Sequence, residues 1–470
     1  MQMEEKIPLN FGLFGHIDSG KTAVASVLSE IISTAGIDAH PQSKERGITI
    51  DIGFTSFLMD EYLITLVDGP GHADLIKISA SSVEIIDCAL LVIDINKGPQ
   101  IQTGEHLVMI ESLGIKNLIV VLNKIDLFKG DLKKAIENTR NFFRSTSFGK
   151  DVPIYAVSAK QKMGFKDLKN GMRQMVESLK LERESGGDVI VPIDHHFTVK
   201  GLGAIITGTV ITGTLHKNQE IDILPIKTKG KVKNIQIFHQ DVSAASAGNR
   251  VGVNLKNIDI NKVYRGCYLT DNRDAFEFCS IAEITVDKSS HFKPKTEFGS
   301  QVHVTIGMET SVANIYPYEE IEGKRLKRSI TQTQSTFRAI LRFQRRVLIP
   351  KNKVVFLLSR LDLPPTTLRI IGSANLIQTH DNLPLFYKYK YKKGKIKYLE
   401  HSDGIVCEGL SQSVKGAKKI IGRELEPPFT KILDSFGTKG AVIIGAEKDI
   451  SEIPKSEPVV LKELRSFQIK

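Results

Sequence analysis

Two patterns of hydrophobic positions divide this chain, and they meet near the glycine pair at residues 186–187. Before that pair, short continuous apolar runs such as YLITLVD and CALLVIDI alternate with segments whose apolar residues recur at helical spacing. Continuous β-branched runs between turn residues are typical of strands that are buried on both faces. Because such strands alternate with helices, residues 1–187 are predicted to form an α/β domain with a doubly wound, parallel sheet.

Beyond residue 187 the pattern changes to short alternating strands separated by glycine turns. Segments such as LGAIITGTVITGTL and KVKNIQIF predict a small antiparallel β-barrel over residues 188–272. Segments such as SQVHVTI and STFRAILRF predict a second barrel over residues 273–385. After that the composition shifts again, and two short α/β stretches predict a small α+β C-terminal domain over residues 386–470.

The C-terminal region begins with a run in which tyrosine and lysine alternate, from Tyr387 to Tyr398. On a strand, this period places three tyrosines on one face and lysines on the other. One interpretation is a surface that binds RNA or the ribosome by stacking. The other is a half-buried strand with a solvated lysine face, and both interpretations stay open at this point.

Composition excludes several classes of protein. Hydrophobic residues make up 41% of the chain and charged residues 25%, which excludes a wholly disordered protein. No apolar run reaches about 18 residues, so we expect no membrane span, and the acidic N-terminus does not resemble a signal peptide. The four cysteines are scattered, which argues against disulfides and a zinc knuckle and favours a reducing, cytoplasmic location.

Charge is distributed unevenly along the chain. Residues 1–187 contain 21 basic and 24 acidic residues, whereas the remainder contains 43 basic and 29 acidic residues. A nearly neutral N-terminal region followed by a basic remainder is consistent with a polyanionic partner such as nucleic acid. It is equally consistent with a lysine-rich solvated surface.

The strongest chemical signal is the string GHIDSGKT, which follows an apolar strand and opens a helix. This is the context of a P-loop, in which glycines let backbone N–H groups close around phosphate oxygens. Lys21 is expected to reach the β and γ phosphates, and Thr22 to offer its hydroxyl to Mg²⁺. The predicted phosphate-binding residues are Asp18, Ser19, Gly20, Lys21 and Thr22, together with Gly71 farther along the chain.

Two further motifs end predicted strands and identify the nucleotide. In DGPGH, Asp68 can hold a metal-bound water and the Gly71 N–H can contact the γ-phosphate. In NKID, the Asp126 carboxylate can accept hydrogen bonds from the two donors on the guanine edge, a pair that adenine lacks. Because all these loops follow strands at one edge of the sheet, we predict a GTPase with GTP or GDP and Mg²⁺ as cofactors. The predicted guanine-binding residues are Asn123, Lys124, Asp126, Ser158, Ala159 and Lys160.

A predicted switch segment, KERGITI, lies between the first two motifs. Thr49 is expected to close on Mg²⁺ only when the γ-phosphate is present. The predicted metal residues are therefore Thr22, Thr49 and, through a water, Asp68. His72 follows the Pro-Gly pair beside the γ-phosphate and is the predicted catalytic residue, because there it can orient the attacking water.

These motifs and the two predicted barrels resemble translational GTPases of the elongation factor Tu class, over roughly residues 7–382. The resemblance implies ribosome-stimulated GTP hydrolysis and transport of aminoacyl-tRNA. It also implies that the 3′ end of the tRNA lies between the GTPase domain and the first barrel. By position, Lys77 is expected to contact the acceptor end and Gln236 to line the site of the terminal adenosine.

The residues at four positions resemble those of a narrower family, the selenocysteine-specific elongation factors of the archaeal and eukaryotic type. They are Phe54 in RGITIDIGF, Asp194 and His195 in PIDHHF, and Arg250 in AGNRVGV. The resemblance implies that these four residues form the pocket for the aminoacyl group. Because a selenol is ionised at neutral pH, Arg250 and His195 are expected to supply its cations. A neutral serine would leave both cations unpaired in a dry pocket.

The implied function is GTP-dependent delivery of selenocysteinyl-tRNA to the ribosome at recoded UGA codons. We expect a monomer that does not contact a membrane. The C-terminal region is too short for the winged helices of the bacterial factor, so a separate RNA-binding adaptor for the messenger element is expected.

Two alternative functions stay open. One is the gamma subunit of initiation factor two, which carries initiator tRNA but usually has a Cys-rich zinc knuckle and ends after the second barrel. The other is a GTPase that modifies or assembles RNA, which would not need a tailored aminoacyl pocket.

Overall fold

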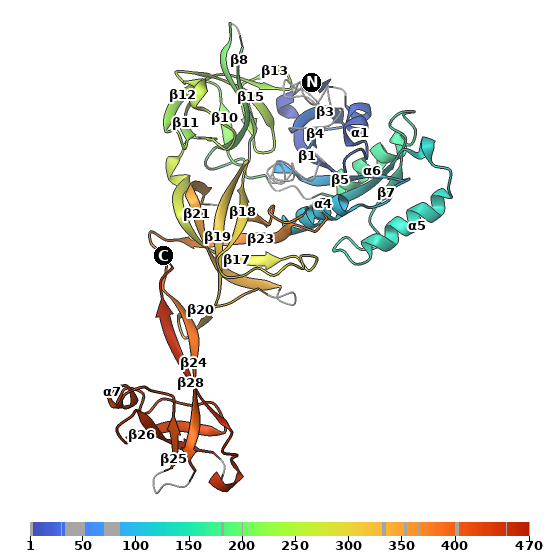
Figure 1. Cartoon of the computed structure of the whole chain (residues 1–470). Coiled ribbons are helices and arrows are strands. Elements are labelled where there is room, and N and C mark those ends of the chain that lie inside the picture. The colour runs from blue at the N-terminus through green and yellow to red at the C-terminus, as the bar shows by residue number, and fades with distance from the viewer. Residues whose placement is uncertain are drawn as a thin grey trace. The chain divides into compact units, whose positions relative to one another are not determined.

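The computed structural model describes residues 3–29, 31–32, 52–69, 85–179, 183–199, 201–330, 335–351, 355–364, 366–399, 404–447 and 449–469. The chain forms two compact units (Figure 1). The first comprises Met1–Pro317 and Ser329–Asp381, and the second comprises Tyr318–Arg328 and Asn382–Lys470. None of the described helices is both long enough and apolar enough to cross a membrane.

The first unit begins with a seven-stranded sheet in the order β2-β3-β4-β1-β5-β6-β7. Its strands are β1 (Ile7–Phe14), β2 (Ile31–Ile32), β3 (Gly53–Met59), β4 (Tyr62–Asp68), β5 (Cys88–Asp94), β6 (Leu118–Asn123) and β7 (Ile154–Ala156). Five of them are mutually parallel, while at one edge β3 pairs antiparallel with β4, and β2 pairs antiparallel with β3. The central strands β5 and β6 are buried throughout, as their continuous apolar runs require.

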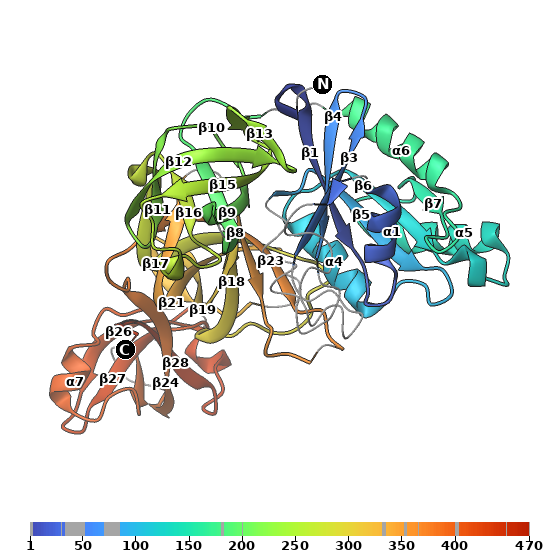
Figure 2. The same cartoon turned by 90° about the horizontal axis from the view of Figure 1, so that it is seen from above.

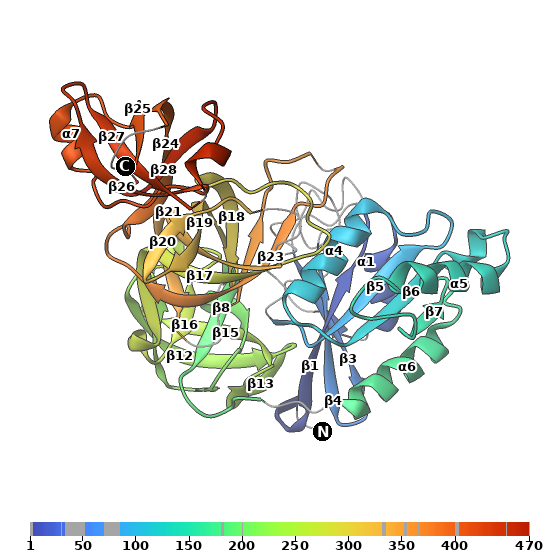
Figure 3. The same ribbon diagram turned by 90° about the horizontal axis from the view of Figure 1, so that it is seen from below.

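Helices cover both faces of this sheet, and Figure 3 shows α4 lying along it. The helices α1 (Lys21–Leu28) and α6 (Phe165–Ser178) contribute to one hydrophobic cluster. The helices α4 (Ile101–Ser112) and α5 (Leu132–Phe143) contribute to a second cluster. The two clusters lie on opposite faces of the strands, so the predicted doubly wound α/β fold is confirmed.

Two closed antiparallel barrels follow (Figure 2). The first consists of β11 (Glu220–Leu224), β16 (Tyr268–Thr270), β8 (Ile190–Val199), β9 (Gly203–Thr209), β15 (Arg250–Lys256) and β12 (Thr228–Ile237), and the pairing of β11 with β12 closes it. The second consists of β18 (Ser300–Ile306), β22 (Val355–Ser359), β23 (Ile370–Thr379), β17 (Phe276–Lys288), β21 (Thr336–Pro350) and β19 (Glu309–Ile321), and β18 closes on β19. Each encloses its own hydrophobic core, as predicted. The strands β10 (Thr214–His216), β13 (Gln240–Val242) and β14 (Ala244–Ser246) lie at the rim of the first barrel.

The second unit is the predicted small α+β domain. It contains β20 (Lys324–Lys327), β24 (Phe386–Tyr398), β25 (Ile405–Glu408), α7 (Val414–Lys418), β26 (Phe429–Phe436), β27 (Ala441–Ala446) and β28 (Pro458–Phe467). Its core lies among β24–β28 and α7. The segment Tyr318–Arg328, which comprises the end of β19 and all of β20, also belongs to this unit. The boundaries predicted after residues 187, 272 and 385 stay predictions.

Candidate functional site

The P-loop has two positions that accept only glycine. Gly15 has a φ of 136°, and a Cβ there would lie 2.1 Å from the carbonyl oxygen of Val92. Gly20 precedes α1 with a φ of 88°, and a Cβ there would lie 2.3 Å from the Nδ2 atom of Asn123. The loop therefore passes close to the ends of two central strands, which brings its backbone N–H groups to the edge where ligands bind in open sheets.

The Lys21 side chain folds back onto the P-loop that precedes it. Its ammonium group donates hydrogen bonds to the carbonyl oxygens of Gly15 and His16, at 3.0 and 3.2 Å. Burial lowers the pKa of Lys21, against the opposing charges of Asp68 and Asp18. A buried cation among backbone dipoles is a suitable partner for the phosphate anion that the motif predicts.

Thr22 and Asp68 lie side by side at the start of α1 and the end of β4. The Thr22 hydroxyl donates a hydrogen bond of 2.7 Å to Oδ2 of Asp68, whose side chain is fully buried. A hydroxyl and a carboxylate are the hard oxygen ligands that Mg²⁺ prefers, so this donor set fits the predicted metal. The other predicted metal residue, Thr49, lies outside the described residues, as do Gly71, His72 and Lys77.

Sequence reasoning did not identify His106, which lies on α4 directly behind the P-loop. The backbone N–H of Gly15 donates a hydrogen bond of 3.0 Å to Nδ1 of His106. Burial, aided by the charge of Lys21, lowers the pKa of His106 to about 3. The imidazole is therefore neutral, and its unprotonated nitrogen fixes the first residue of the loop.

Replacing His106 with asparagine should make the stability of the protein less sensitive to acid. Between pH 6.5 and about 3, the unfolded chain binds a proton at His106 that the folded chain excludes. Stability is therefore lost as the pH falls through this window, and asparagine, which does not titrate, removes that loss. Between pH 7.5 and pH 5, the free energy of unfolding should fall by about 2 kcal/mol more in the wild type than in His106→Asn. Urea titrations at both pH values measure this difference, and equal losses in the two proteins would contradict it.

The predicted guanine-binding residues lie together after β6 and β7. Asn123 joins the two loops, because its Nδ2 donates to the carbonyl oxygen of Ser19 at 3.0 Å and its Oδ1 accepts from the N–H of Ala159 at 3.1 Å. The Ser158 hydroxyl donates a hydrogen bond of 2.6 Å to Oδ1 of Asp126. This contact orients the carboxylate on which nucleotide specificity is expected to depend.

Two lysines of these motifs occupy different environments. Lys124 has a φ of 68°, and its Nζ lies 2.9 Å from Oδ2 of Asp94 at the end of β5. Lys160 is exposed to solvent. The ion pair with Asp94 holds Lys124 at the strand edge, whereas Lys160 is free to approach a bound base from outside.

The four residues of the predicted aminoacyl pocket form one connected group. Arg250, at the start of β15, makes a bidentate ion pair with Asp194 of β8, and the two side chains are 3% and 0% exposed. The guanidinium carbon lies 3.4 Å from the ring centroid of Phe54, which belongs to β3 of the α/β domain. Nδ1 of His195 lies 2.8 Å from Oδ1 of Asp194. A single carboxylate thus binds both predicted cations.

This arrangement changes the predicted electrostatics of the pocket. Burial raises the pKa of Asp194, but the Arg250 charge and the hydrogen bond from His195 outweigh burial and hold that pKa well below its usual range. Asp194 is therefore ionised and neutralises Arg250. The expectation that a neutral occupant leaves two unpaired cations is wrong for Arg250, because Asp194 already pairs with it.

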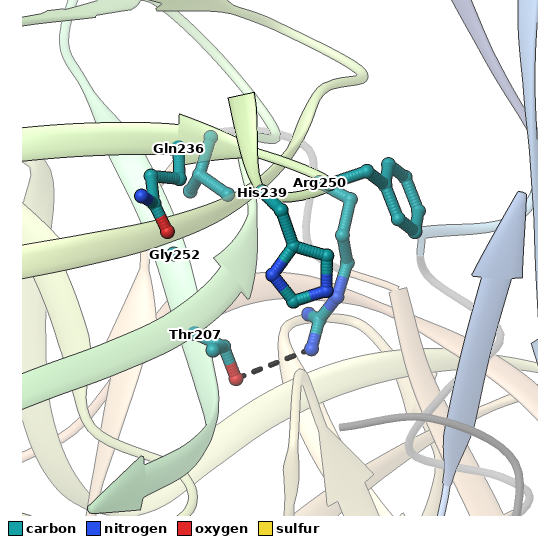
Figure 4. Close-up of a pocket in the computed structure, with 7 residues that line it drawn as sticks. Thr207, Gln236, His239, Arg250 and Gly252 are labelled. Carbon is teal, nitrogen blue, oxygen red and sulfur yellow. Dashed lines mark hydrogen bonds between the residues drawn. The ribbon is translucent and has the colours of Figure 1, made fainter. Parts of the chain in front are cut away.

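Thr207 is a further member that sequence reasoning missed. Its hydroxyl donates to Oδ1 of Asp194 at 2.7 Å and accepts from Arg250 at 3.2 Å. Figure 4 shows Thr207, Gln236 and His239 around Arg250. These side chains, with Phe238, line a cavity of about 30 Å³ next to the guanidinium, which is enough for one water-sized group.

A larger cavity of about 500 Å³ shares Gln236 and His239 with the small one. This volume is typical of sites for small organic ligands. His239 lies in the two-residue turn between β12 and β13, where Phe238 and His239 have φ values of 44° and 68°. Glycine or asparagine is usual at such positions, so the strained turn holds the His239 side chain at the cavity.

The chain matches three family models. They are the elongation factor Tu GTP-binding domain over residues 6–179, elongation factor Tu domain 2 over residues 203–270, and domain III of the archaeal selenocysteine-specific elongation factor over residues 281–380. The three matches follow one another in the order of the three domains of the first unit.

Similar proteins extend the match to the whole chain. A selenocysteine-specific elongation factor from Methanocaldococcus jannaschii is 39% identical over 469 residues, which covers 98% of each chain. One from Mus musculus is 36% identical over 329 residues, which covers 65% of this chain and 56% of that protein. The crystal structure of translation elongation factor SelB from Methanococcus maripaludis in complex with the GTP analogue GppNHp aligns with a TM-score of 0.82. It is 32% identical, over 99% of this chain and all of that one.

Proposed function

Because this chain belongs to the family of selenocysteine-specific elongation factors, we propose that it delivers selenocysteinyl-tRNA to the ribosome at recoded UGA codons. Its first domain is a guanine-nucleotide-binding GTPase domain of the elongation factor Tu type. In the proposed cycle, the GTP form binds the tRNA, and contact with the ribosome stimulates hydrolysis and release.

The observation that carries this proposal is the contact of Phe54 and Arg250 across two domains. Phe54 lies on the strand that directly follows the predicted switch segment, and its ring stacks on the guanidinium that Asp194 holds in the barrel. A movement of the switch segment therefore changes the wall of the aminoacyl pocket. This links the state of the nucleotide to the affinity for the aminoacyl group.

In the proposed pocket, His195 supplies the charge that recognises the selenolate. Asp194 has already neutralised Arg250, and the contact of Nδ1 of His195 with Asp194 holds the imidazole in one orientation. The Arg250 guanidinium then has a structural role, because it holds the Asp194 carboxylate in position. The adjoining cavity of about 500 Å³, lined by Gln236 and His239, accommodates the terminal adenosine.

The hydrolytic site uses the residues around the P-loop. Lys21 and the loop N–H groups would hold the phosphates, Thr22, Thr49 and, through a water, Asp68 would hold Mg²⁺, and His72 would orient the attacking water. Bound Mg²⁺ supplies neutralisation of the developing phosphate charge. Asp126, oriented by Ser158, selects guanine.

The proposal predicts that the GTP form protects selenocysteinyl-tRNA from ester hydrolysis far better than seryl-tRNA on the same tRNA body. One charge-assisted hydrogen bond to a selenolate corresponds to a preference of about 10- to 100-fold. The measurement is the rate of deacylation at increasing protein concentration, with GTP and with GDP. His195→Gln should lose the preference and keep its GTP affinity, and equal protection of both tRNAs by the wild type would contradict the proposal.

The alternative of an initiation factor gamma subunit lacks support in the described structure. That class usually carries a Cys-rich zinc knuckle, whereas residues 1–187 of this sequence contain a single cysteine, Cys88. The match to the archaeal selenocysteine-specific domain III and the full-length relative also favour the first proposal.

A further inference from the structure

The strands β24 and β28 of the second unit form a long antiparallel ribbon (Figure 1). Ten residue pairs join them, from Phe386 with Phe467 to Lys395 with Pro458. On its other edge, β24 pairs with β20 only at Phe386 and Tyr387, and with β25 only from Lys395 onward. In the described part of the chain, the middle of the ribbon therefore consists of two strands alone.

One face of this ribbon carries three tyrosines in a row. Tyr387, Tyr389 and Tyr391 alternate along β24, and the residues opposite them on β28 are Ser466, Leu464 and Lys462. None of the six is buried, and Tyr391 is 51% exposed. Residues opposite each other on paired strands project from the same face, so the tyrosines form one aromatic row, which is half-buried at Tyr387 and Tyr389 and exposed at Tyr391.

The other face of the ribbon is the one that packs. Phe386 lies in the interior at one end, and Val459 and Leu461 enter the core of the unit at the other. Between them, Glu463 pairs with Lys392, Arg423 and Arg465. This face is buried mainly through β28 and the ends of β24, whereas Lys388 and Lys390 in the middle of β24 are exposed.

The tyrosine face also carries cations. β24 contains no acidic residue, and of its six lysines Lys388, Lys390 and Lys392 lie on the opposite face. Lys393 and Lys395 continue the tyrosine face along the strand, and Nζ of Lys462 lies 4.1 Å from the ring centroid of Tyr389. A cation at this distance is held over the ring by a cation–π contact, which places a positive charge within the row of tyrosines.

We propose that this face binds single-stranded nucleic acid by stacking bases on Tyr387, Tyr389 and Tyr391 while the lysines bind the phosphates. The ring centroids of Tyr389 and Tyr391 are 6.5 Å apart, so each ring accepts a separate base of an unstacked strand. Positive grooves that carry successive aromatic side chains bind single strands in this way. In a double helix the base faces are already stacked on one another, and an acidic peptide has no bases that could stack on the tyrosine rings.

The site is independent of the proposed aminoacyl pocket, because it lies entirely in the second unit. The first experiment uses the fact that the sequence contains no tryptophan. In full-length Tyr391→Trp, the new indole is a single reporter on the face. Octauridylate and octathymidylate should quench its fluorescence, less so as salt rises, and the two oligonucleotides show whether ribose or deoxyribose is preferred. Absence of quenching, or equal quenching by an RNA duplex or by polyglutamate, overturns the proposal.

The second experiment separates stacking from charge. Labelled octauridylate is titrated with the full chain and followed by fluorescence anisotropy. The triple variant Tyr387→Ser, Tyr389→Ser, Tyr391→Ser should bind about 100-fold more weakly, whereas the triple phenylalanine variant should stay within about threefold of the wild type. Tyr398→Ser removes an equally exposed tyrosine of the same strand and serves as the matched control. Wild-type affinity in the triple serine variant shows that charge alone attracts the strand, and it overturns the proposal.

Discussion

Asp194→Ala is expected to lower the free energy of unfolding by about 3–5 kcal/mol, which is the usual cost of leaving a buried ion without its partner. Arg250 is nearly inaccessible to solvent, and Asp194 binds it with both carboxylate oxygens. The substitution also removes the acceptor for His195 and Thr207. Urea denaturation followed by circular dichroism measures the loss, and the same variant should no longer prefer selenocysteinyl-tRNA.

A second substitution provides the control. In Asp194→Ala with Arg250→Met, both charges are gone, and the apolar side chain still covers the ring of Phe54. This double variant should recover to within about 2 kcal/mol of the wild type, because replacing a whole buried pair costs far less than breaking it. A double variant as unstable as Asp194→Ala would show that the loss arises from packing and not from the unpaired guanidinium.

The effect of Asp194→Ala should also depend on pH. Arg250 and His195 hold the pKa of Asp194 well below its usual range, against the opposing effect of burial. The stability that this carboxylate contributes is complete above about pH 4, the pKa of an unfolded aspartate, and is lost as the pH falls below it. The difference between wild type and variant should therefore shrink in acid.

The architecture was predictable because the spacing of hydrophobic residues along the chain differs between the α/β domain and the barrels. Continuous runs such as CALLVIDI became buried parallel strands, and the alternating segments after residue 187 became the two barrels. The base-reading residues were predictable for a similar reason, since Asn123 and Asp126 follow a strand whose carboxyl end must face the P-loop.

The contacts that were missed join residues far apart in the chain. His106 reaches the P-loop, and its neighbour Glu105 makes a buried, bidentate ion pair with Arg369 next to the second barrel strand β23. On the sequence, both residues look like ordinary polar positions of a helix. The pairing of Asp194 with Arg250 was missed as well, because the pattern assigned both cations to a ligand and did not reveal that the fold supplies a counter-ion.

Turn chemistry explains another missed residue. His239 lies in a hairpin turn whose two residues both have positive φ, without the glycine or asparagine that marks such turns in a sequence. The turn therefore departs from the usual residue preference at a position whose side chain lines a cavity. Backbone strain of this kind is more often retained at functional sites than elsewhere.

Asp126→Asn should weaken GTP binding by about 10³-fold and create affinity for xanthosine triphosphate. The carboxylate is expected to accept two charge-assisted hydrogen bonds from guanine, each worth about 1.5–3 kcal/mol. Asparagine offers one acceptor and one donor, which matches the N1–H and the C2 carbonyl of xanthine. The Ser158 hydroxyl can still donate to Oδ1 of the asparagine, so the side chain keeps its orientation. Competition of both triphosphates against a fluorescent GDP derivative measures the exchange of specificity.

The matched control is Asp131→Asn, which makes the same change of charge in the same domain. Asp131 caps α5 by accepting hydrogen bonds from the N–H groups of Lys133 and Lys134, and asparagine performs this role equally well. Its nucleotide affinities should equal those of the wild type. If Asp126→Asn also binds GTP with wild-type affinity, Asp126 does not read the base. If Asp126→Asn loses GTP and gains no xanthosine triphosphate, the loss comes from a disturbed loop, and the contact with Ser158 does not orient the side chain as the structure indicates.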